Sequence, residues 1–232
     1  RTLYQAAVRQ VDASIGRLLA TLSASGVRDE AAVVVAGDHG EEFQEHGHLA
    51  HYPKLYDELI RVPLIVDVPG ADGRRIDGQV GLDSIPPTVA DLLGVESPPE
   101  WLGSTLAPAV LEGEPPADEP VVSVTVRGEE VTTQPIPRSL GDGDLLVSVR
   151  DREWTYIENV DRGIEELYYR PDDPAEQTDL SGEEDAEKRR VLDRFGSIAD
   201  EHARRLRTRT DETSEADVDE DLEHRLEALG YR

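Results

Sequence analysis

The apolar positions at the beginning of the chain recur with helical spacing. Between Tyr4 and Leu22 the large apolar side chains fall mostly three or four positions apart, which places them on one face of a helix. Gly26 follows and ends the pattern. The sequence therefore predicts a single long helix of about five turns in this region.

Two short apolar runs come next and predict strands. Residues 31–36 read AAVVVA, and residues 62–68 read VPLIVDV. Continuous runs rich in β-branched residues are typical of strands that are buried on both faces of a parallel sheet. A polar loop that ends at Pro53 and a short helical segment over residues 55–60 lie between the two runs. This succession of helices and strands is typical of an α/β fold.

The pattern changes in the second half of the chain. A helix is expected to start beside Pro86-Pro87 and to end at Gly94, and residues 96–120 are expected to form a loop rich in Pro, Glu and Gly. Short strand-like runs separated by turn residues then predict a small antiparallel sheet, which a charged amphipathic helix follows. The strands are expected at residues 121–126, 145–149, 154–158 and 167–169, and the helix at residues 185–208.

Acidic residues outnumber basic ones about two to one. The 232 residues include 50 Asp and Glu against 24 Lys and Arg, for a formal net charge of −26. A surface of this charge repels nucleic acids and anionic membranes, and no apolar run approaches the roughly 20 residues of a membrane span. We therefore expect neither a nucleic acid nor a membrane as a partner.

The composition also bears on the chemistry and the solvent. Lys54 and Lys188 are the only lysines, and there is no cysteine, which excludes disulfides, thiolate metal ligands and cysteine nucleophiles. An acidic excess with scarce lysine is typical of a halophilic protein, because high salt screens charge repulsion; an acidic protein from an ordinary environment is the alternative. The chain opens at Arg1 without a signal-peptide pattern, so we expect a missing N-terminal half.

The clearest local motif is Asp38-His39, between two glycines at the end of the first predicted strand. In an open α/β sheet, ligands bind beyond the carboxyl ends of the strands. Asp offers a hard anionic oxygen and His a neutral nitrogen, and the two together suit a divalent cation. An Asp that caps a turn beside a surface His explains the same residues equally well.

The loop that follows is rich in histidine and carboxylates. Four of the six histidines lie between residues 39 and 51, with Glu41, Glu42 and Glu45 among them. Either a separate metal site or a solvated polar loop would have this composition, and the spacing matches no known zinc pattern. Lys54 closes the loop, and its ammonium could stabilise the charge of an anionic ester; a surface lysine that packs its stem is the simpler interpretation.

Several segments, taken in order, resemble the sulfatases of the alkaline phosphatase superfamily. The segments that carry the resemblance are YQAAVRQVDASIGRLLATL, VVVAGDHGEEFQEHGH, KLYDELIRVPLIVDVPG, GLDSIPPTVADLLGV, LGSTLAP, ELYYRPDDPAEQTDL and LEHRLEALGYR. The resemblance covers nearly the whole chain and is weak around residues 112–145. Because the segments follow the order of the family, the set is more specific than any single motif.

This resemblance implies a fold and a metal site. The fold is α/β, part of an alkaline-phosphatase-like sheet sandwiched by helices, with a small C-terminal antiparallel β subdomain and a terminal helix. Asp38 and His39 would be two ligands of one Ca²⁺ or Mg²⁺ ion that polarises a sulfate ester, and Lys54 or His51 would bind a sulfate oxygen. The nucleophile of the family is a formylglycine made from the Cys or Ser of a C/S-x-P-x-R motif. This motif does not occur here, so the formylglycine is expected upstream.

The resemblance also implies a division of the chain. Residues 1–111 would be the C-terminal part of the α/β sulfatase catalytic domain. Residues 112–208 would be a small antiparallel subdomain with its packing helix, and residues 209–232 an acidic tail with a short terminal helix at 222–229.

The expected function is hydrolysis of a small-molecule or glycan sulfate ester by the intact protein. These residues alone are expected to be inactive, because two protein ligands hold a hard cation poorly. Two alternatives stay open. A phosphoester or phosphonate hydrolase, or a phosphoglycerol transferase, of the same superfamily keeps the Asp-His pair and has an upstream Thr or Ser nucleophile. A non-catalytic sulfatase-like remnant would be a binding or structural module.

Overall fold

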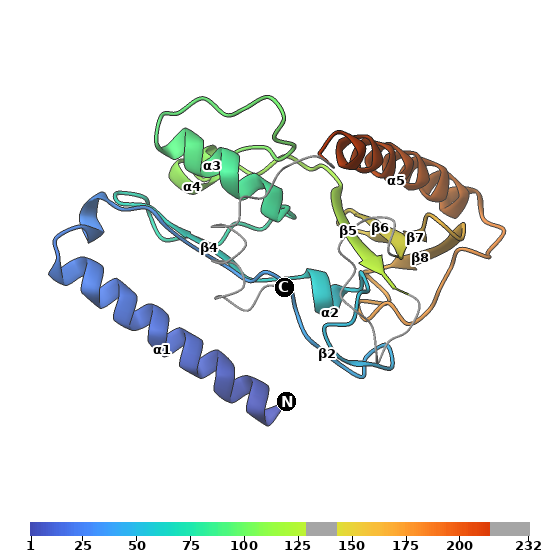
Figure 1. The fold of residues 1–232 in the computed structure, drawn as a ribbon, viewed down its shortest axis with the longest axis horizontal. Helices are drawn as coiled ribbons and strands as arrows, with labels where there is room; N and C mark the ends of the chain where they lie inside the picture. Colours follow the sequence, from blue (N-terminus) through green and yellow to red (C-terminus); the bar gives the residue numbers. More distant parts are fainter. Residues whose placement is uncertain (129–142, 214–232) are drawn as a thin grey trace.

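The computed structural model describes residues 1–128 and 143–213. Its elements alternate at first and then separate into a run of strands and a last helix (Figure 1). In chain order they are α1 (Thr2–Ala24), η1 (Arg28–Glu30), β1 (Val33–Ala36), β2 (Glu42–Phe43), β3 (Leu49–Ala50), α2 (Asp57–Ile60), β4 (Leu64–Asp67), η2 (Leu82–Ser84), α3 (Ile85–Leu92), α4 (Ala107–Leu111), β5 (Val121–Arg127), β6 (Asp144–Arg150), β7 (Trp154–Asn159), β8 (Ile164–Tyr169) and α5 (Ala186–Thr213). The α/β fold with a C-terminal antiparallel sheet and helix is confirmed. The short helix expected at residues 222–229 lies outside the described residues.

Strands β1 and β4 form a two-stranded sheet, but they pair in the antiparallel sense. Val33 lies opposite Asp67, and Ala36 lies opposite Leu64, so the prediction of parallel strands is wrong. Neither strand is buried on both faces, because every residue of the two is half-buried or exposed. A continuous apolar run indicates that both faces of a strand suit burial, but it carries no information on the direction of the neighbouring strand.

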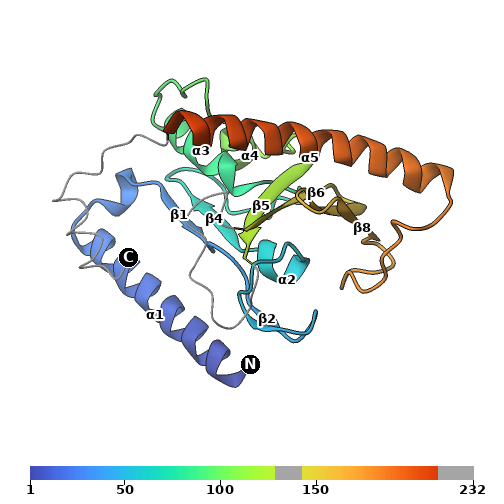
Figure 2. The same ribbon diagram turned by 45° about the vertical axis from the view of Figure 1, so that its right-hand side comes forward.

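The four C-terminal strands form an antiparallel sheet in the order β5-β6-β7-β8. They confirm the four predicted strands, and α5 confirms the charged helix. Helix α5 lies across this sheet (Figure 2). Phe195 and Ala199 of the helix are fully buried in one apolar cluster with Val147, Tyr156 and Leu167 of the sheet. Burial of a side chain such as Phe195 stabilises the fold by about 1.5–3 kcal/mol relative to exposure.

Helix α3 confirms the predicted helix before Gly94, whereas the sequence does not predict α4. Gly94 has a φ of +67°, the left-handed conformation that commonly ends a helix. Helix α4 lies within residues 96–120, so the prediction of a loop is wrong for this part of the segment. The hydroxyl of Thr88 on α3 accepts a hydrogen bond from the amide of Leu106, directly before α4, at 2.8 Å. This contact is tertiary, and local sequence patterns do not contain it.

Helix α1 confirms the predicted long helix, and its apolar face is exposed. It lies apart from the four-stranded sheet in both views (Figures 1 and 2). None of its residues is buried, and Leu3, Val11 and Leu18 are 87%, 59% and 56% exposed. Contiguous exposed apolar surface is typical of a face that packs against further polypeptide. Within residues 1–128 and 143–213, no helix has both the length and the apolar character that a membrane crossing requires.

Candidate metal centre

Strand β1 ends in a tight turn that carries the candidate ligands. The amide of Gly40 donates a hydrogen bond to the carbonyl oxygen of Leu59 at 2.7 Å. A β-carbon at position 40 would lie 1.9 Å from the carbonyl oxygen of Glu58, so the close approach of the two backbones requires glycine. The turn is therefore fastened directly to helix α2.

The Asp38 and His39 side chains lie close to one another at this turn. Asp38 Oδ1 accepts a hydrogen bond from the His39 amide at 2.9 Å, and Oδ2 lies 3.9 Å from His39 Nε2. The hydrogen bond from the His39 amide is the main cause that lowers the pKa of the Asp38 carboxyl. Both side chains are open to solvent, at 90% and 47% exposed. Because a carboxylate binds a metal in its deprotonated form, Asp38 is ready to do so at neutral pH.

The loop brings His51 and Glu41 to the same place. The ring centroids of His39 and His51 are 4.5 Å apart, and Nδ1 of His51 lies 3.5 Å from Oε2 of Glu41. The sequence predicts His51 as a site residue, but it gives Glu41 no role beyond the polar character of the loop. Strands β2 and β3 pair as a short hairpin and return the chain toward His39. Gly47 lies in the turn with a φ of +86°. A glycine between two short polar runs is the sequence signal by which this hairpin could have been predicted.

Lys54 is engaged elsewhere in the loop. Its ammonium donates to both carboxylate oxygens of Glu42, at 3.1 and 3.0 Å, and to the carbonyl oxygen of His46 at 2.7 Å. These bonds use all three donors of an ammonium group. The Lys54 side chain is 8% exposed and that of Glu42 is fully buried. The structure thus brings the other three predicted site residues together and gives Lys54 a place in the support of the loop.

Glu42 is the acceptor around which the loop folds. Its Oε1 also accepts hydrogen bonds from the amides of His46 and His48, at 2.9 and 2.8 Å. Burial raises the pKa of this carboxyl, but the hydrogen bonds from the His48 amide and the Lys54 ammonium outweigh burial and lower the pKa of Glu42 overall. A buried charge pair therefore orders a loop that has little apolar side-chain packing of its own.

His46 fastens the loop to the C-terminal part of the chain. Its Nδ1 lies 2.6 Å from Oε1 of Glu58, and its Nε2 lies 2.8 Å from the carbonyl oxygen of Glu176. Burial lowers the pKa of His46, but the hydrogen bonds to the Glu176 carbonyl and the Glu58 carboxylate raise it overall. The ring also stacks on Tyr56, with centroids 3.6 Å apart. His46 therefore links the loop, helix α2 and the segment after β8.

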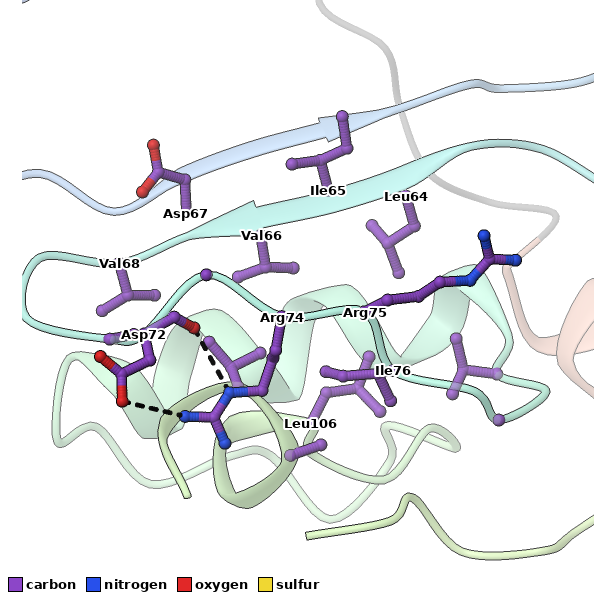
Figure 3. Close-up of a pocket in the computed structure, with 16 residues that line it drawn as sticks. Leu64, Ile65, Val66, Asp67, Val68, Asp72, Arg74, Arg75, Ile76 and Leu106 are labelled. Carbon is purple, nitrogen blue, oxygen red and sulfur yellow. Dashed lines mark hydrogen bonds and ion pairs between the residues drawn. The ribbon is translucent and has the colours of Figure 1, made fainter. Parts of the chain in front are cut away.

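The cavity drawn in Figure 3 lies away from these residues. It has a volume of about 610 Å³ and is lined by β4, residues 71–76 and α4. Val66 and Leu106 are among its apolar side chains, and Arg74 is held at one side by an ion pair with Asp72. None of the candidate ligands lines this cavity. The candidate metal centre is therefore a separate arrangement on the exposed loop.

The turn and the loop both lie in a part of the chain that matches a family model. Residues 1–95 match the Sulfatase family. Curated sulfatases are similar over longer stretches. The Delta 4,5-hexuronate-2-O-sulfatase of Bacteroides thetaiotaomicron is 26% identical over 234 residues, which cover 98% of this chain and 45% of that protein. The choline-sulfatase of Rhizobium meliloti is 30% identical over 185 residues, which cover 78% of this chain and 33% of that protein.

Solved structures that are similar to this chain share its fold. The phosphonate monoester hydrolase SpPMH from Silicibacter pomeroyi has a TM-score of 0.69 and 27% identity, over 84% of this chain and 39% of that one. The structure of BT4656 in complex with its substrate D-glucosamine-2-N,6-O-disulfate has a TM-score of 0.68 and 26% identity, over 87% of this chain and 40% of that one. The chain spans less than half the length of each of these relatives.

Proposed function

We propose that this chain is part of a sulfuric ester hydrolase of the sulfatase family. One observation carries the proposal: the turn after β1 places Asp38 beside His39 within the segment that matches the Sulfatase family model. The similarity to curated sulfatases supports a small-molecule or glycan sulfate ester as the substrate. Hydrolysis of this ester would be the activity of the intact protein.

Asp38 and His39 are suited to hold one divalent cation, Ca²⁺ or Mg²⁺. The Asp38 carboxylate is an exposed, hard oxygen ligand with a lowered pKa, and His39 presents a nitrogen 3.9 Å from it. Such ions prefer six or more ligands, so water or polypeptide outside these residues would supply the others. When bound, the ion supplies Lewis-acid polarisation of the ester oxygen.

We propose that His51 binds an oxygen of the ester. Its side chain is 62% exposed, and its ring lies 4.5 Å from that of His39, so a ring N–H here would donate a hydrogen bond to an anionic ester oxygen. Lys54, the other residue predicted for this task, would act as a positioning residue, because its ammonium holds the loop that carries His51. The formylglycine nucleophile would come from outside these residues, which contain no C/S-x-P-x-R motif.

The division of the chain forms part of the same proposal. Residues 1–111 would belong to the catalytic α/β domain, residues 112–208 to a small subdomain and residues 209–232 to an acidic tail. The exposed apolar face of α1 supports the view that an N-terminal half completes the catalytic domain, because packing against it would remove this face from water.

A phosphonate or phosphate ester hydrolase is the second candidate. The phosphonate monoester hydrolase of Silicibacter pomeroyi matches this fold with a TM-score of 0.69, against 0.68 for the structure of BT4656. Monoesters of sulfate and phosphonate are both tetrahedral anions, and an Asp-His pair with a bound cation would serve either. A phosphoglycerol transferase and a non-catalytic module remain outcomes of the same test.

The test uses the intact protein that contains these residues. Wild type is compared with Asp38→Asn and with Asp172→Asn, a matched control at another exposed aspartate. At about 100 times its Kd, Ca²⁺ or Mg²⁺ stabilises the wild type by about 2.7 kcal/mol. We expect Asp38→Asn to weaken cation binding at least about tenfold and to abolish hydrolysis of 4-nitrophenyl sulfate, whereas the control keeps both.

The possible outcomes separate the candidate functions. Cation binding and turnover that are unchanged by Asp38→Asn would overturn the proposed site. Turnover of a phosphonate monoester in place of the sulfate would favour the second candidate. Binding of the cation without turnover of any of these esters would favour a non-catalytic module or a phosphoglycerol transferase.

A further inference from the structure

A second candidate ligand set lies beside the Asp38–His39 pair. His39, Glu41 and His51 each present a ligand atom, and the three atoms lie within 4.8 Å of one another. Among residues 1–128 and 143–213, no other three His, Asp or Glu side chains bring their ligand atoms this close together. Tetrahedral Zn²⁺ with bonds of about 2.0–2.2 Å needs donor atoms about 3.4 Å apart. Small rotations of these side chains, two of which are largely exposed, would bring the atoms to that distance.

The tautomer of His39 is set in favour of metal binding. Its Nδ1 lies 2.9 Å from the carbonyl oxygen of Gly40, which can only accept, so Nδ1 carries the ring hydrogen and donates a hydrogen bond to this oxygen. The lone pair of Nε2 is then free for a metal. Gly40 itself is fixed, because its amide is bonded to Leu59. The backbone therefore orients the His39 ring as second-shell partners commonly orient the histidine ligands of metal sites.

The other two ligands face one another across the same space. Nδ1 of His51 lies 3.5 Å from Oε2 of Glu41, and the His51 ring lies 4.5 Å from that of His39. A dication between these two side chains would be bound by both the imidazole nitrogen and the carboxylate oxygen.

We propose that His39, Glu41 and His51 form a binding site for a first-row transition-metal dication of the Zn²⁺ and Co²⁺ type. Two imidazoles and one carboxylate form a set in which nitrogen ligands predominate, which suits such metals, whereas Ca²⁺ and Mg²⁺ favour sets in which oxygen ligands predominate. The site leaves a coordination position open, which a water molecule would fill. It does not depend on the proposed hydrolysis, but it shares His39 with the Asp38 pair and His51 with the proposed ester site. A transition metal in this site would therefore compete for His39 with the cation of the hydrolase.

The test uses Co²⁺ as a probe, because tetrahedral Co²⁺ gives an intense visible absorption band that an aqueous Co²⁺ ion lacks. Co²⁺ is titrated into the intact protein in the presence of excess Mg²⁺. We expect one equivalent to produce the band. Loss of an outer-shell partner already weakens metal binding by about 10–100-fold, so His51→Gln and Glu41→Gln should each raise the apparent Kd for Co²⁺ at least tenfold.

Two further variants are the controls. His48→Gln removes a histidine of the same loop that is outside the ligand set and stacks on Tyr52, and it should keep the band. Asp38→Asn removes a ligand of the hydrolase pair only, and it should also keep the band. Thermal unfolding without metal checks that each variant folds; if His51→Gln does not, Glu41→Gln carries the test.

The experiment can refute the transition-metal site without refuting the proposed hydrolase function. A band that survives both His51→Gln and Glu41→Gln, or no band in the wild type, overturns the transition-metal site. A band that is lost in Asp38→Asn and kept in His51→Gln places Co²⁺ at the Asp38 pair, which overturns the second site and leaves the hydrolase proposal standing.

Discussion

At the scale of single residues, the position of His39 depends on the absence of a β-carbon at the neighbouring Gly40. Gly40 has no β-carbon, and the carbonyl oxygen of Glu58 occupies the space that this carbon would fill. The Gly40 carbonyl in turn accepts the hydrogen bond of the His39 ring. The packing of one glycine against α2 therefore sets the orientation of a candidate ligand.

We expect Gly40→Ala to lower the free energy of unfolding by about 1–3 kcal/mol, the cost of forcing extra volume into a packed site. The added methyl group would lie 1.9 Å from the Glu58 carbonyl oxygen and must push α2 away from the turn. Gly16→Ala is the matched control, because nothing lies within 4 Å of a β-carbon at that position of α1. Alanine is favoured over glycine in a helix interior by about 1 kcal/mol. Urea denaturation of the two variants checks both signs, and equal stabilities would contradict the close approach at Gly40.

His46 makes the stability of the fold depend on pH. Its raised pKa means that it stabilises the folded state fully below its ordinary pKa of about 6.5 and loses this contribution as the pH rises through the higher folded value. Burial lowers the pKa of His46, and the Lys54 charge lowers it further, but the Glu176 carbonyl and the Glu58 carboxylate outweigh both. We expect the free energy of unfolding to fall as the pH rises above about 6.5.

Urea unfolding at a series of pH values measures this effect. His46→Gln should flatten the profile in this range, and His202→Gln on α5 is the control that should keep it. A profile with the same slope in wild type and His46→Gln would show that another group titrates there.

At the scale of elements, the buried ion pair of Glu42 and Lys54 holds the loop between β2 and α2 together. Glu42 accepts hydrogen bonds from two backbone amides and from Lys54, and these bonds join both arms of the hairpin. A buried pair of this kind contributes little net stability relative to apolar residues, but loss of one partner leaves an uncompensated charge. The shape of the loop therefore depends on the pair remaining complete.

We expect Lys54→Met to destabilise the protein by roughly 3–5 kcal/mol, because the Glu42 carboxylate would stay buried without its cation. Lys188, the other lysine of the chain, is the matched control. It pairs with Glu183, which is half exposed, so Lys188→Met should change the stability much less. Chemical denaturation of the two variants measures the difference. Comparable losses in both would mean that the Glu42 pair is not the support of the loop.

The sequence predicts elements better than it predicts their partners. Helical spacing and strand-like runs locate α1, β4 and the four C-terminal strands, because these patterns are local. The antiparallel pairing of β1 with β4 joins residues that are 28 to 34 positions apart. Helix α4 starts where the Leu106 amide donates a hydrogen bond to the Thr88 hydroxyl, so neither feature could be found from a local pattern. In the site, the pattern places the Asp-His turn, but only the hairpin fold shows that Lys54 turns to Glu42.

At the scale of the whole molecule, acidic charge is in excess while the buried charges are paired. Arg150 of β6 bonds to Asp57 of α2 and, at 2.6 Å, to Glu176 after β8. This buried group joins the first half of the chain to the C-terminal sheet. Within residues 1–128 and 143–213, most Asp and Glu side chains are not buried, and salt screens the repulsion between such solvent-facing charges.

We propose a halophilic character for the protein and expect its melting temperature to rise between 0.1 and 2 M KCl. The Debye length falls from about 10 Å at 0.1 M salt to about 3 Å at 1 M, so the mutual repulsion of exposed carboxylates weakens over this range. Sucrose, which stabilises by exclusion from the surface and not by screening, is the control and should have a smaller effect at equal osmolality. A melting temperature that is constant or falls with KCl would contradict this proposal.

The hydrogen bond between His46 and Glu176 also has a consequence for the synthesis of the chain. The two residues are 130 positions apart, and a ribosome that adds about 5–20 residues per second needs roughly 7–26 s to cover that distance. During this interval the nascent loop already carries Asp38, His39 and His51 but not yet its C-terminal tether. Translation therefore exposes the candidate ligands to cellular metal ions several seconds before the polypeptide that fastens their loop has been made.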